Sequence, residues 1–378
     1  MLAIAFAALS ARTLAEAAAR EGIGAIALDL FGDRDTRCAA LQWLSIGKPD
    51  TLRIDSARLL DALQALAKSG EVQGWVAGAG FDGRSELLEQ GAACLPLLGT
   101  AAADVCRVRD PVGFFGFLRA NGIGHPPVRH HASEDTAGWL AKDAGGCGGW
   151  HIARAADAVV DSASPLHYWQ REVSGIAMSA TFVANGRDAV LLGHNQQIVR
   201  TVGARPFVFC GLCGPVPVSA AVALEVSAAA RALAGAFGLR GLGSLDYMLD
   251  GERVSVLEVN ARPPASMALY PDVGGAGVMR AHLRACLHDE LPHDPQRPAG
   301  RVGGTEIVFA PRALRLDDAA AAALASWPGA HDLPHAGTHF GAGDPLCSVT
   351  ASGPDADSVK IALARQRDAV LQQLETVR

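Results

Sequence analysis

The chain has 378 residues, of which 49% are hydrophobic and 19% are charged, and its formal net charge is −6. This composition is typical of a compact globular protein with two or three domains and excludes a disordered chain. The negative charge disfavours a nucleic-acid binder, and no uninterrupted apolar run reaches the length of a membrane span. The apolar first nine residues lack the basic flank of a secretory signal, so we expect a cytoplasmic protein that binds neither nucleic acid nor membrane.

The beginning of the chain predicts alternating strands and helices. Residues 1–8 read as a strand, Ser10 as a helix N-cap, 12–21 as a helix ending at Gly22, and 25–30 as a second strand. This order predicts a parallel sheet with ligand-facing residues at the carboxyl ends of its strands, such as Ser10 and Asp29. Gly78-Ala79-Gly80 follows another apolar strand, but the first strand-to-helix turn has no G-x-G-x-x-G, so a dehydrogenase is only a minor alternative.

A lysine followed by a glycine-rich run is the first chemical motif along the chain. A predicted strand delivers Lys142, and the run after it contains Gly145, Gly146, Gly148 and Gly149. Glycines let backbone N–H groups approach an anion closely, and the lysine supplies a positive charge, so the segment predicts a phosphate site. The lysine precedes the glycines, unlike in a P-loop, and the alternative interpretation is a flexible linker.

A hairpin near residue 250 carries the second motif. Strands over 247–249 and 254–257 flank Asp250-Gly251, and Glu258 and Asn260 share one face of the second strand because they are two residues apart. With Asp246 they offer the oxygen ligands that Mg²⁺ prefers, although a solvated surface hairpin is the alternative. A regular two-residue turn at Asp250-Gly251 would place the two carboxylates on opposite faces. Metal binding by both therefore requires an odd-numbered loop or a β-bulge.

Glu258-Val-Asn260-Ala-Arg262, with Asp246 twelve residues before the glutamate, resembles the metal-binding signature of the ATP-grasp superfamily. Together with the lysine and glycine run, the chain resembles predicted ATP-dependent carboligases related to biotin carboxylase. This resemblance implies Mg²⁺, with Mn²⁺ as an alternative ion, bound by Asp246, Glu258 and Asn260. It also implies that Lys142 and Arg262 are catalytic phosphate contacts and that the glycines cover the phosphates of ATP. The expected adenine-binding hinge consists of Gln170, Arg171, Glu172 and Val173.

Two positions depart from the family pattern. Many members carry a lysine before the helix that opens the fold, whereas this chain has Arg107 and Arg109 there, and either could contact phosphate instead. The glutamate that often binds ribose is replaced by Ala177, so Glu172 is the alternative ribose ligand.

The expected fold is α/β (α+β): a Rossmann-like parallel-sheet domain over 1–105, an ATP-grasp nucleotide-binding domain over 106–298, and a small β-rich C-terminal domain over 299–378. The implied activity is that of an ADP-forming carboxylate–amine ligase, which makes an acyl phosphate and then an amide from small-molecule substrates. A role in making pterin- or furan-type one-carbon carriers and a homodimeric assembly are further expectations. The alternative is a non-catalytic nucleotide-binding regulatory protein that has kept the fold.

Two other patterns predict no metal site. Cys210 and Cys213 form a lone C-x-x-C among eight scattered cysteines, which we interpret as buried small hydrophobic residues in a reducing compartment, with zinc as the weaker reading. His331, His335 and His339 recur every four residues, but Pro334 and the nearby glycines argue against a helical metal-binding face.

Overall fold

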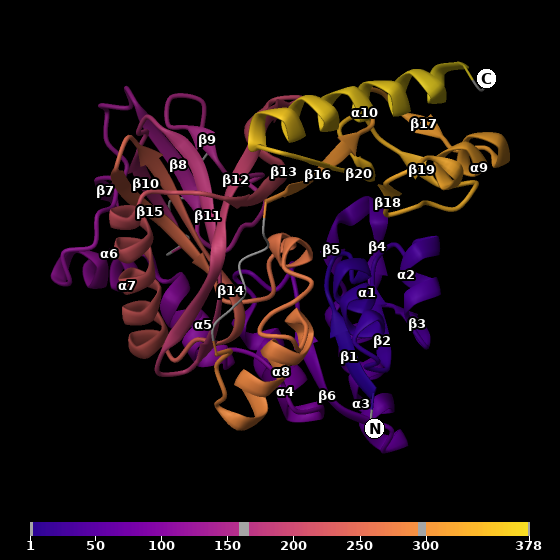
Figure 1. The fold of residues 1–378 in the computed structure, drawn as a ribbon, viewed down its shortest axis with the longest axis horizontal. Helices are drawn as coiled ribbons and strands as arrows, with labels where there is room; N and C mark the ends of the chain where they lie inside the picture. Colours follow the sequence, from indigo (N-terminus) through magenta and orange to yellow (C-terminus); the bar gives the residue numbers. More distant parts are fainter. Residues whose placement is uncertain (1–2, 159–165, 294–299, 377–378) are drawn as a thin grey trace.

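The computed structural model describes residues 3–158, 166–293 and 300–376 (Figure 1). Its N-terminal part is a four-stranded sheet in the order β3-β2-β1-β6, and all three strand pairs are parallel, which confirms the predicted sheet. The strands are β1 (Ala3–Ala7), β2 (Ala25–Asp29), β3 (Gln42–Ser45) and β6 (Val72–Ala77), and a short hairpin is formed by β4 (Gly47–Lys48) and β5 (Arg53–Ile54). The accompanying helices are α1 (Arg12–Arg20), α2 (Arg34–Ala39), α3 (Ser56–Ser69) and α4 (Ser85–Cys94).

Ser10 and Asp29 have roles other than the expected ones. The N-cap of α1 is Ala11, whose N–H donates to Asp29 Oδ2 at 2.9 Å, whereas the Ser10 hydroxyl donates to Asp332 at 3.4 Å. The fully buried Asp29 carboxylate also accepts the N–H groups of Phe31 and Gly32 and the indole N–H of Trp43. Because these donors satisfy it, Asp29 fixes the loop at the end of its strand instead of facing a ligand.

The middle of the chain begins with α5 (Ala102–Arg109) and α6 (Pro111–Ala120). The Asp110 carboxylate caps α6 by accepting the N–H groups of Val112 and Gly113, and Pro111 occupies the first helical turn. A small antiparallel sheet follows in the order β7-β10-β8-β9, comprising β7 (Val128–Arg129), β8 (Trp139–Asp143), β9 (Ala153–Arg154) and β10 (His167–Arg171).

A larger antiparallel sheet has eight strands in the order β15-β14-β11-β12-β13-β16-β20-β18. Its first five strands by position are β15 (Arg253–Asn260), β14 (Arg240–Asp250), β11 (Ile176–Asn185), β12 (Ala189–Val202) and β13 (Arg205–Val216). Helix α7 (Ala220–Phe237) packs against this sheet, and its N-cap Ser219 accepts the N–H of Val222. By length and composition alone α7 could cross a membrane, but core helices of soluble proteins pass the same test.

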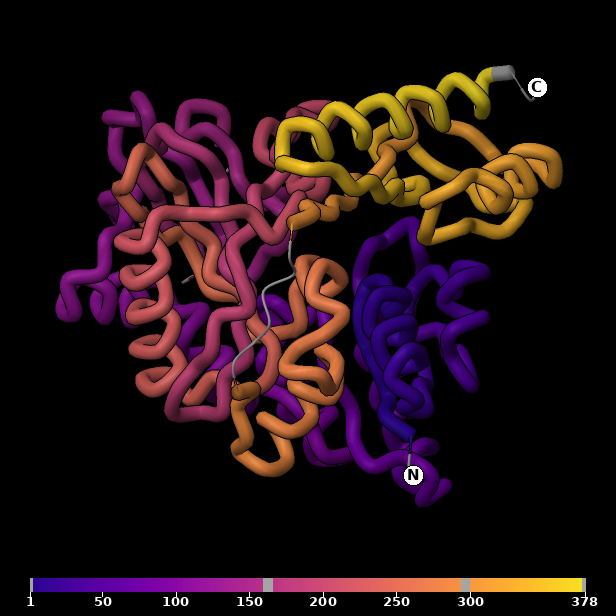
Figure 2. Tube along the Cα trace, in the orientation of Figure 1, coloured from indigo at the N-terminus to yellow at the C-terminus, as the bar shows by residue number. Residues whose placement is uncertain are grey.

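The C-terminal part extends the larger sheet with β16, β20 and β18, and its β17 and β19 pair in a separate two-stranded sheet. Strand β16 (Val302–Phe309) pairs with β13 on one side and with β20 (Pro345–Gly353) on the other. Helix α10 (Ala356–Thr376) lies along these strands, in yellow in Figure 2. The remaining elements are β17 (Leu314–Arg315), α9 (Asp318–Ser326), β18 (Ala330–His331) and β19 (His339–Phe340). The boundary expected at 298 lies outside the described residues, and the three domain limits stay predictions.

Helix α8 (Val278–His288) joins the middle of the chain to the N-terminal sheet domain. The Glu21 carboxylate, just after α1, accepts the N–H groups of Met279 and Arg280 at the start of α8 at 2.9 and 2.7 Å. Side chains of both helices share one hydrophobic core. This packing places the N-terminal sheet domain against β14 and β11 of the larger sheet through α8 (Figure 1).

Candidate functional site

A β-bulge brings the two predicted metal carboxylates together. Asp250 pairs with Arg253, so the turn is Gly251-Glu252, one residue later than expected, with Gly251 at a φ of 60°. The pairing stays regular as far as Tyr247 and Val256 and then shifts, so that Asp246 lies directly opposite Glu258. Leu257 is the extra residue. Residues directly opposite each other share a face, so the bulge meets the condition that a regular hairpin would fail.

The two carboxylates have opposite pKa shifts. Burial and the charge of Glu258 raise the pKa of Asp246 to about 6. Burial also acts to raise the pKa of Glu258, but the nearby cations, chiefly Arg109 and Lys142, outweigh it and lower that pKa. The closest guanidinium nitrogen of Arg109 lies 3.7 Å from Glu258 Oε2. A divalent cation would relieve the repulsion between the paired carboxylates, so the donor set fits Mg²⁺.

Asn260 lies beside this pair, but its amide oxygen faces away from it. Its Nδ2 donates to Asp246 Oδ2 at 3.2 Å and to Ser244 Oγ at 3.3 Å. Its Oδ1 accepts from Arg109 and from Arg262, each at 3.3 Å. If the Asn260 side-chain amide rotated by half a turn, its Oδ1 would face Asp246. Asn260 can serve as the proposed metal ligand only after that rotation.

Lys142 faces the same site from the smaller sheet. It lies on β8 opposite Tyr168 of β10, is only 4% exposed, and donates to Gln170 Oε1 at 3.2 Å. Burial acts to lower the pKa of Lys142, but Tyr168 and Glu258 outweigh this effect and raise it. The lysine is therefore a buried positive charge whose field reaches the carboxylates of the hairpin.

The expected adenine hinge, residues 170–173, has one free donor among its described amides. The N–H of Arg171 donates to Pro127 O and that of Glu172 donates to Gly138 O, at 2.8 and 2.9 Å, which leaves the N–H of Val173. The Gln170 side chain points inward, and its Nε2 is buried without a hydrogen-bond partner. Glu172 is exposed and pairs with Arg154 at 3.0 Å, so a role in binding ribose would require breaking that ion pair.

The glycine loop, residues 145–149, lies against β13 of the larger sheet. The N–H of Phe209 on β13 donates to Gly148 O at 2.9 Å, and Gly148 and Gly149 have φ of 65° and 75°. A Cβ atom added at Gly149 would overlap the carbonyl oxygen of Phe207, and one at Gly146 would overlap the His151 ring. Glycine is therefore required for the loop to approach the sheet this closely.

Of the two arginines expected to replace the family's lysine, only Arg109 lies in the site. Arg107 is exposed and pairs with Asp104, whereas Arg109 is 8% exposed and contacts Glu258 and Asn260. Arg109 and Arg262, the arginine pair, both bond the carboxylate of Asp82, which follows β6. The sequence alone does not indicate Asp82, Tyr168 or His151 as residues of the site. The position of Asp82 after a parallel strand was the one available signal.

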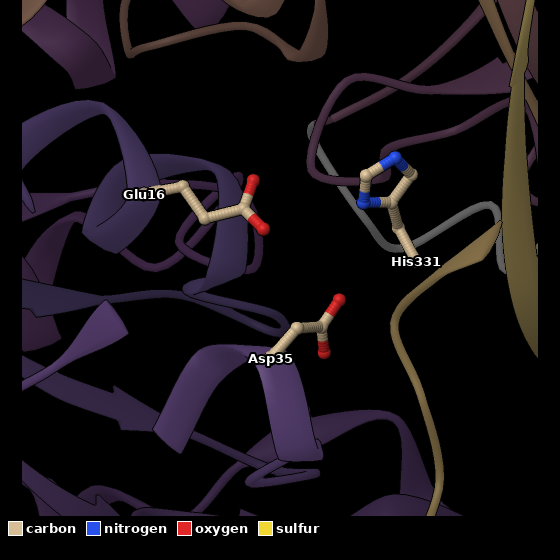
Figure 3. Close-up of side chains that lie close together, drawn as sticks. All are labelled: Glu16, Asp35 and His331. Atoms are coloured by element: carbon tan, nitrogen blue, oxygen red, sulfur yellow. The ribbon is translucent and has the colours of Figure 1, made fainter. Parts of the chain in front are cut away.

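A second cluster of ionisable groups joins the N- and C-terminal parts. Glu16, Asp35 and His331 point toward one another with one potential ligand atom each within 4.8 Å (Figure 3). Arg12 already bonds Glu16 at 2.9 Å and lies 3.6 Å from Asp35, whose carboxylate also accepts the N–H groups of residues 332 and 333. Because these donors already bond the carboxylates of Glu16 and Asp35, we interpret the cluster as a structural contact between the N- and C-terminal parts and not as a metal site.

These features define a class of protein: two antiparallel sheets, one with a buried lysine and a glycine loop and the other with paired carboxylates, enclose a polar site beside a parallel-sheet domain. These features are similar to those of ATP-grasp proteins. Residues 109–266 match the family model described as ATP-grasp domain. No curated protein sequence matches the chain significantly.

Solved structures share the fold over almost the whole chain. Biotin carboxylase from Campylobacter jejuni has a TM-score of 0.72 at 13% identity, over 99% of this chain and 95% of that one. N5-carboxyaminoimidazole synthase from Aspergillus clavatus has a TM-score of 0.70 at 16% identity, over 98% of both chains. An L-amino acid ligase from Bacillus licheniformis has a TM-score of 0.70 at 13% identity, over 97% of both. The expected fold class is therefore confirmed.

Proposed function

We propose that the chain is an ADP-forming ligase that joins a small carboxylate to an amine. In the first step a carboxylate oxygen attacks the terminal phosphorus of ATP, giving an acyl phosphate and ADP. In the second step the amine nitrogen attacks the acyl carbon, the phosphate leaves, and a proton lost from nitrogen completes the amide. The observation that carries the proposal is the bulge at Leu257, which sets Asp246 opposite Glu258 within the field of Lys142.

Each residue of the site has a proposed part in this reaction. Asp246, Glu258 and Asn260 would hold Mg²⁺ or Mn²⁺, and the ion would neutralise charge on the transferred phosphoryl group. Lys142, Arg262 and Arg109 would bind phosphate oxygens and hold them in line with the acceptor. The glycine loop would cover the phosphates, and the Val173 N–H and the unpartnered Gln170 amide would meet the base or its neighbouring phosphates.

The structural relatives support a nucleotide and a divalent ion. The matched structures include the Campylobacter biotin carboxylase with an ATP complex and the Aspergillus synthase with ADP and 5-aminoimidazole ribonucleotide. A biotin carboxylase domain dimer from Hydrogenobacter thermophilus contains magnesium ADP. By analogy we propose a homodimer. On the sequence resemblance alone, we place the substrates among precursors of pterin- or furan-type one-carbon carriers.

The deciding experiment measures ADP release with MgATP over a panel of carboxylic acids, with and without amines. The proposal predicts acid-dependent ADP release, and hydroxylamine should intercept the acyl phosphate as a hydroxamate in place of the amine. A protein that binds a non-hydrolysable ATP analogue with Mg²⁺ but releases no ADP with any acid would instead fit the regulatory alternative. Arg109 and Ala177, which differ from the family pattern, are the observations that favour the regulatory alternative.

A further inference from the structure

Asp82 of the N-terminal sheet domain reaches into the polar site of the ATP-grasp domain. It follows β6, its side chain is 6% exposed, and its carboxylate bonds both members of the arginine pair. Arg109 donates to Asp82 Oδ1, and Arg262 Nε lies 3.4 and 3.3 Å from the two carboxylate oxygens. Burial acts to raise the pKa of Asp82, but Arg262 and Arg109 outweigh it and lower that pKa, so the group is an anion.

The arginine pair forms an anion-binding position at the edge of the proposed metal site. Both guanidinium groups donate to Asn260 Oδ1, and Arg109 also lies 3.7 Å from Glu258. Two guanidinium groups converging on one point are suited to a carboxylate or a phosphate. In this structure the anion that both arginines bind is the Asp82 carboxylate, a side chain of the protein itself.

The charges of the site already balance with Asp82 in place. Lys142, Arg109 and Arg262 supply three positive charges, and Asp82, Asp246 and Glu258 supply three carboxylates. A cavity of about 30 Å³ beside the arginine pair has room for roughly two water molecules. A phosphate group that binds the arginines must therefore displace Asp82 or accept a buried like-charge neighbour, which is costly.

The next residue, Gly83, connects the same loop to the glycine loop. A Cβ added at Gly83 would collide with the backbone of Gly145, so the two segments are in close contact. Arg109 also donates to Ala144 O at 3.3 Å, just before the glycine loop. Segment 82–83 thus contacts both the arginine pair and the glycine loop, which are the two elements proposed to bind phosphate. A movement of this segment would therefore break contacts with both of them.

We propose that Asp82 is an internal anion that occupies the phosphate position of the arginine pair in the ligand-free protein and is displaced when a phosphate group binds. The contact couples the N-terminal domain to the site: displacement of Asp82 releases segment 82–83 from Arg109, Arg262 and the glycine loop together. The inference rests on the proposed function only in taking the phosphate of a nucleotide or of an acyl phosphate as the natural ligand.

The first test compares the binding of inorganic phosphate, without metal, to the wild type and to Asp82→Asn by calorimetry. The asparagine side chain would keep the shape of the aspartate but remove its charge, so phosphate affinity should rise roughly tenfold. Asp61→Asn is the matched control, because Asp61 is exposed on α3 of the same domain and the change in net charge is identical. Unchanged or weaker phosphate binding by a folded Asp82→Asn variant overturns the proposal.

The second test needs no variant. Hydrogen exchange of the wild-type amides at 82–84 should become faster when phosphate saturates the site, because the segment loses its anchor on the arginine pair. Exchange that stays constant or slows overturns the proposal, and this result decides the matter if Asp82→Asn does not fold. Binding of a non-hydrolysable ATP analogue with Mg²⁺ is measured in parallel. Its absence, with the phosphate effects intact, would refute the proposed function and leave the role of Asp82 standing.

Discussion

Asp246 and Glu258 lie directly opposite each other across β14 and β15 because Leu257 is an extra residue in the second strand. Closer to the turn, every pair joins one odd-numbered and one even-numbered residue, as for Tyr247 and Val256. The bulge shifts the register by one residue, so beyond it the opposed residues Asp246 and Glu258 are both even-numbered. One inserted residue therefore decides whether two carboxylates share a face, and with it whether one ion can bind both.

We expect Glu258→Gln to weaken Mn²⁺ binding in the presence of ADP by roughly tenfold or more, because a neutral amide replaces a charged ligand. Titration followed by the Mn²⁺ electron paramagnetic resonance signal measures the free ion directly. Glu252→Gln is the control, since Glu252 is exposed in the turn of the same hairpin. Equal affinity in the two variants would remove Glu258 from the metal site.

Lys142→Ala should weaken the binding of a non-hydrolysable ATP analogue by about 1.5–3 kcal/mol, the contribution of a hydrogen bond to a charged group. The lysine is buried and faces Glu258, so the variant should also unfold at lower denaturant concentration. Calorimetry gives the affinity and urea denaturation gives the stability. Lys48→Ala, at an exposed position, should change neither quantity; nucleotide affinity at the wild-type level in Lys142→Ala would refute the assignment.

The glycine loop allows a comparison between adjacent positions. Gly148 and Gly149 both have positive φ, so alanine is strained at each, but only at Gly149 would the new Cβ overlap Phe207 O. Gly149→Ala should therefore release the loop from β13 and slow turnover well beyond Gly148→Ala. Limited proteolysis within 145–149 and the rate of ADP release measure the two effects. Equal behaviour of the two variants would show that docking on β13 is unimportant.

The raised pKa of Asp33 predicts that the stability of the protein depends on pH, independently of the nucleotide site. The residue is 7% exposed, and burial, together with Asp332, Asp29 and Asp35, raises the pKa of its carboxyl to about 8. Between its ordinary pKa near 4 and about 8 the folded state holds a proton that the unfolded state has lost. The contribution of Asp33 to stability is therefore present below pH 4 and is lost as the pH rises toward 8.

Asp33→Asn should consequently raise the free energy of unfolding at pH 8 relative to the wild type and have little effect at pH 4. Denaturant titrations at several pH values provide the measurement, and Asp50→Asn, at an exposed position, is the control. A difference between Asp33→Asn and the wild type that does not grow with pH would contradict the raised pKa.

The sequence determined the elements whose signals are local. Alternating strands and helices predicted the parallel sheet, and the lysine and glycine run predicted a loop after β8. Hydrophobic periodicity, capping and glycine geometry depend on residues close together in the chain, so they can be read without coordinates. For the same reason, the candidate metal and phosphate residues were identified, while their assigned roles stay predictions.

Only the tertiary structure decided what depends on distant segments. It placed Arg109 and not Arg107 in the site, moved the turn by one residue and introduced the bulge at Leu257. It also brought Asp82 to Arg262, 180 residues away, and joined the C-terminal strands to the larger sheet through β13 and β16. Strand pairing and ion pairs across domains are fixed by packing of the whole chain, and no spacing between neighbouring residues records them.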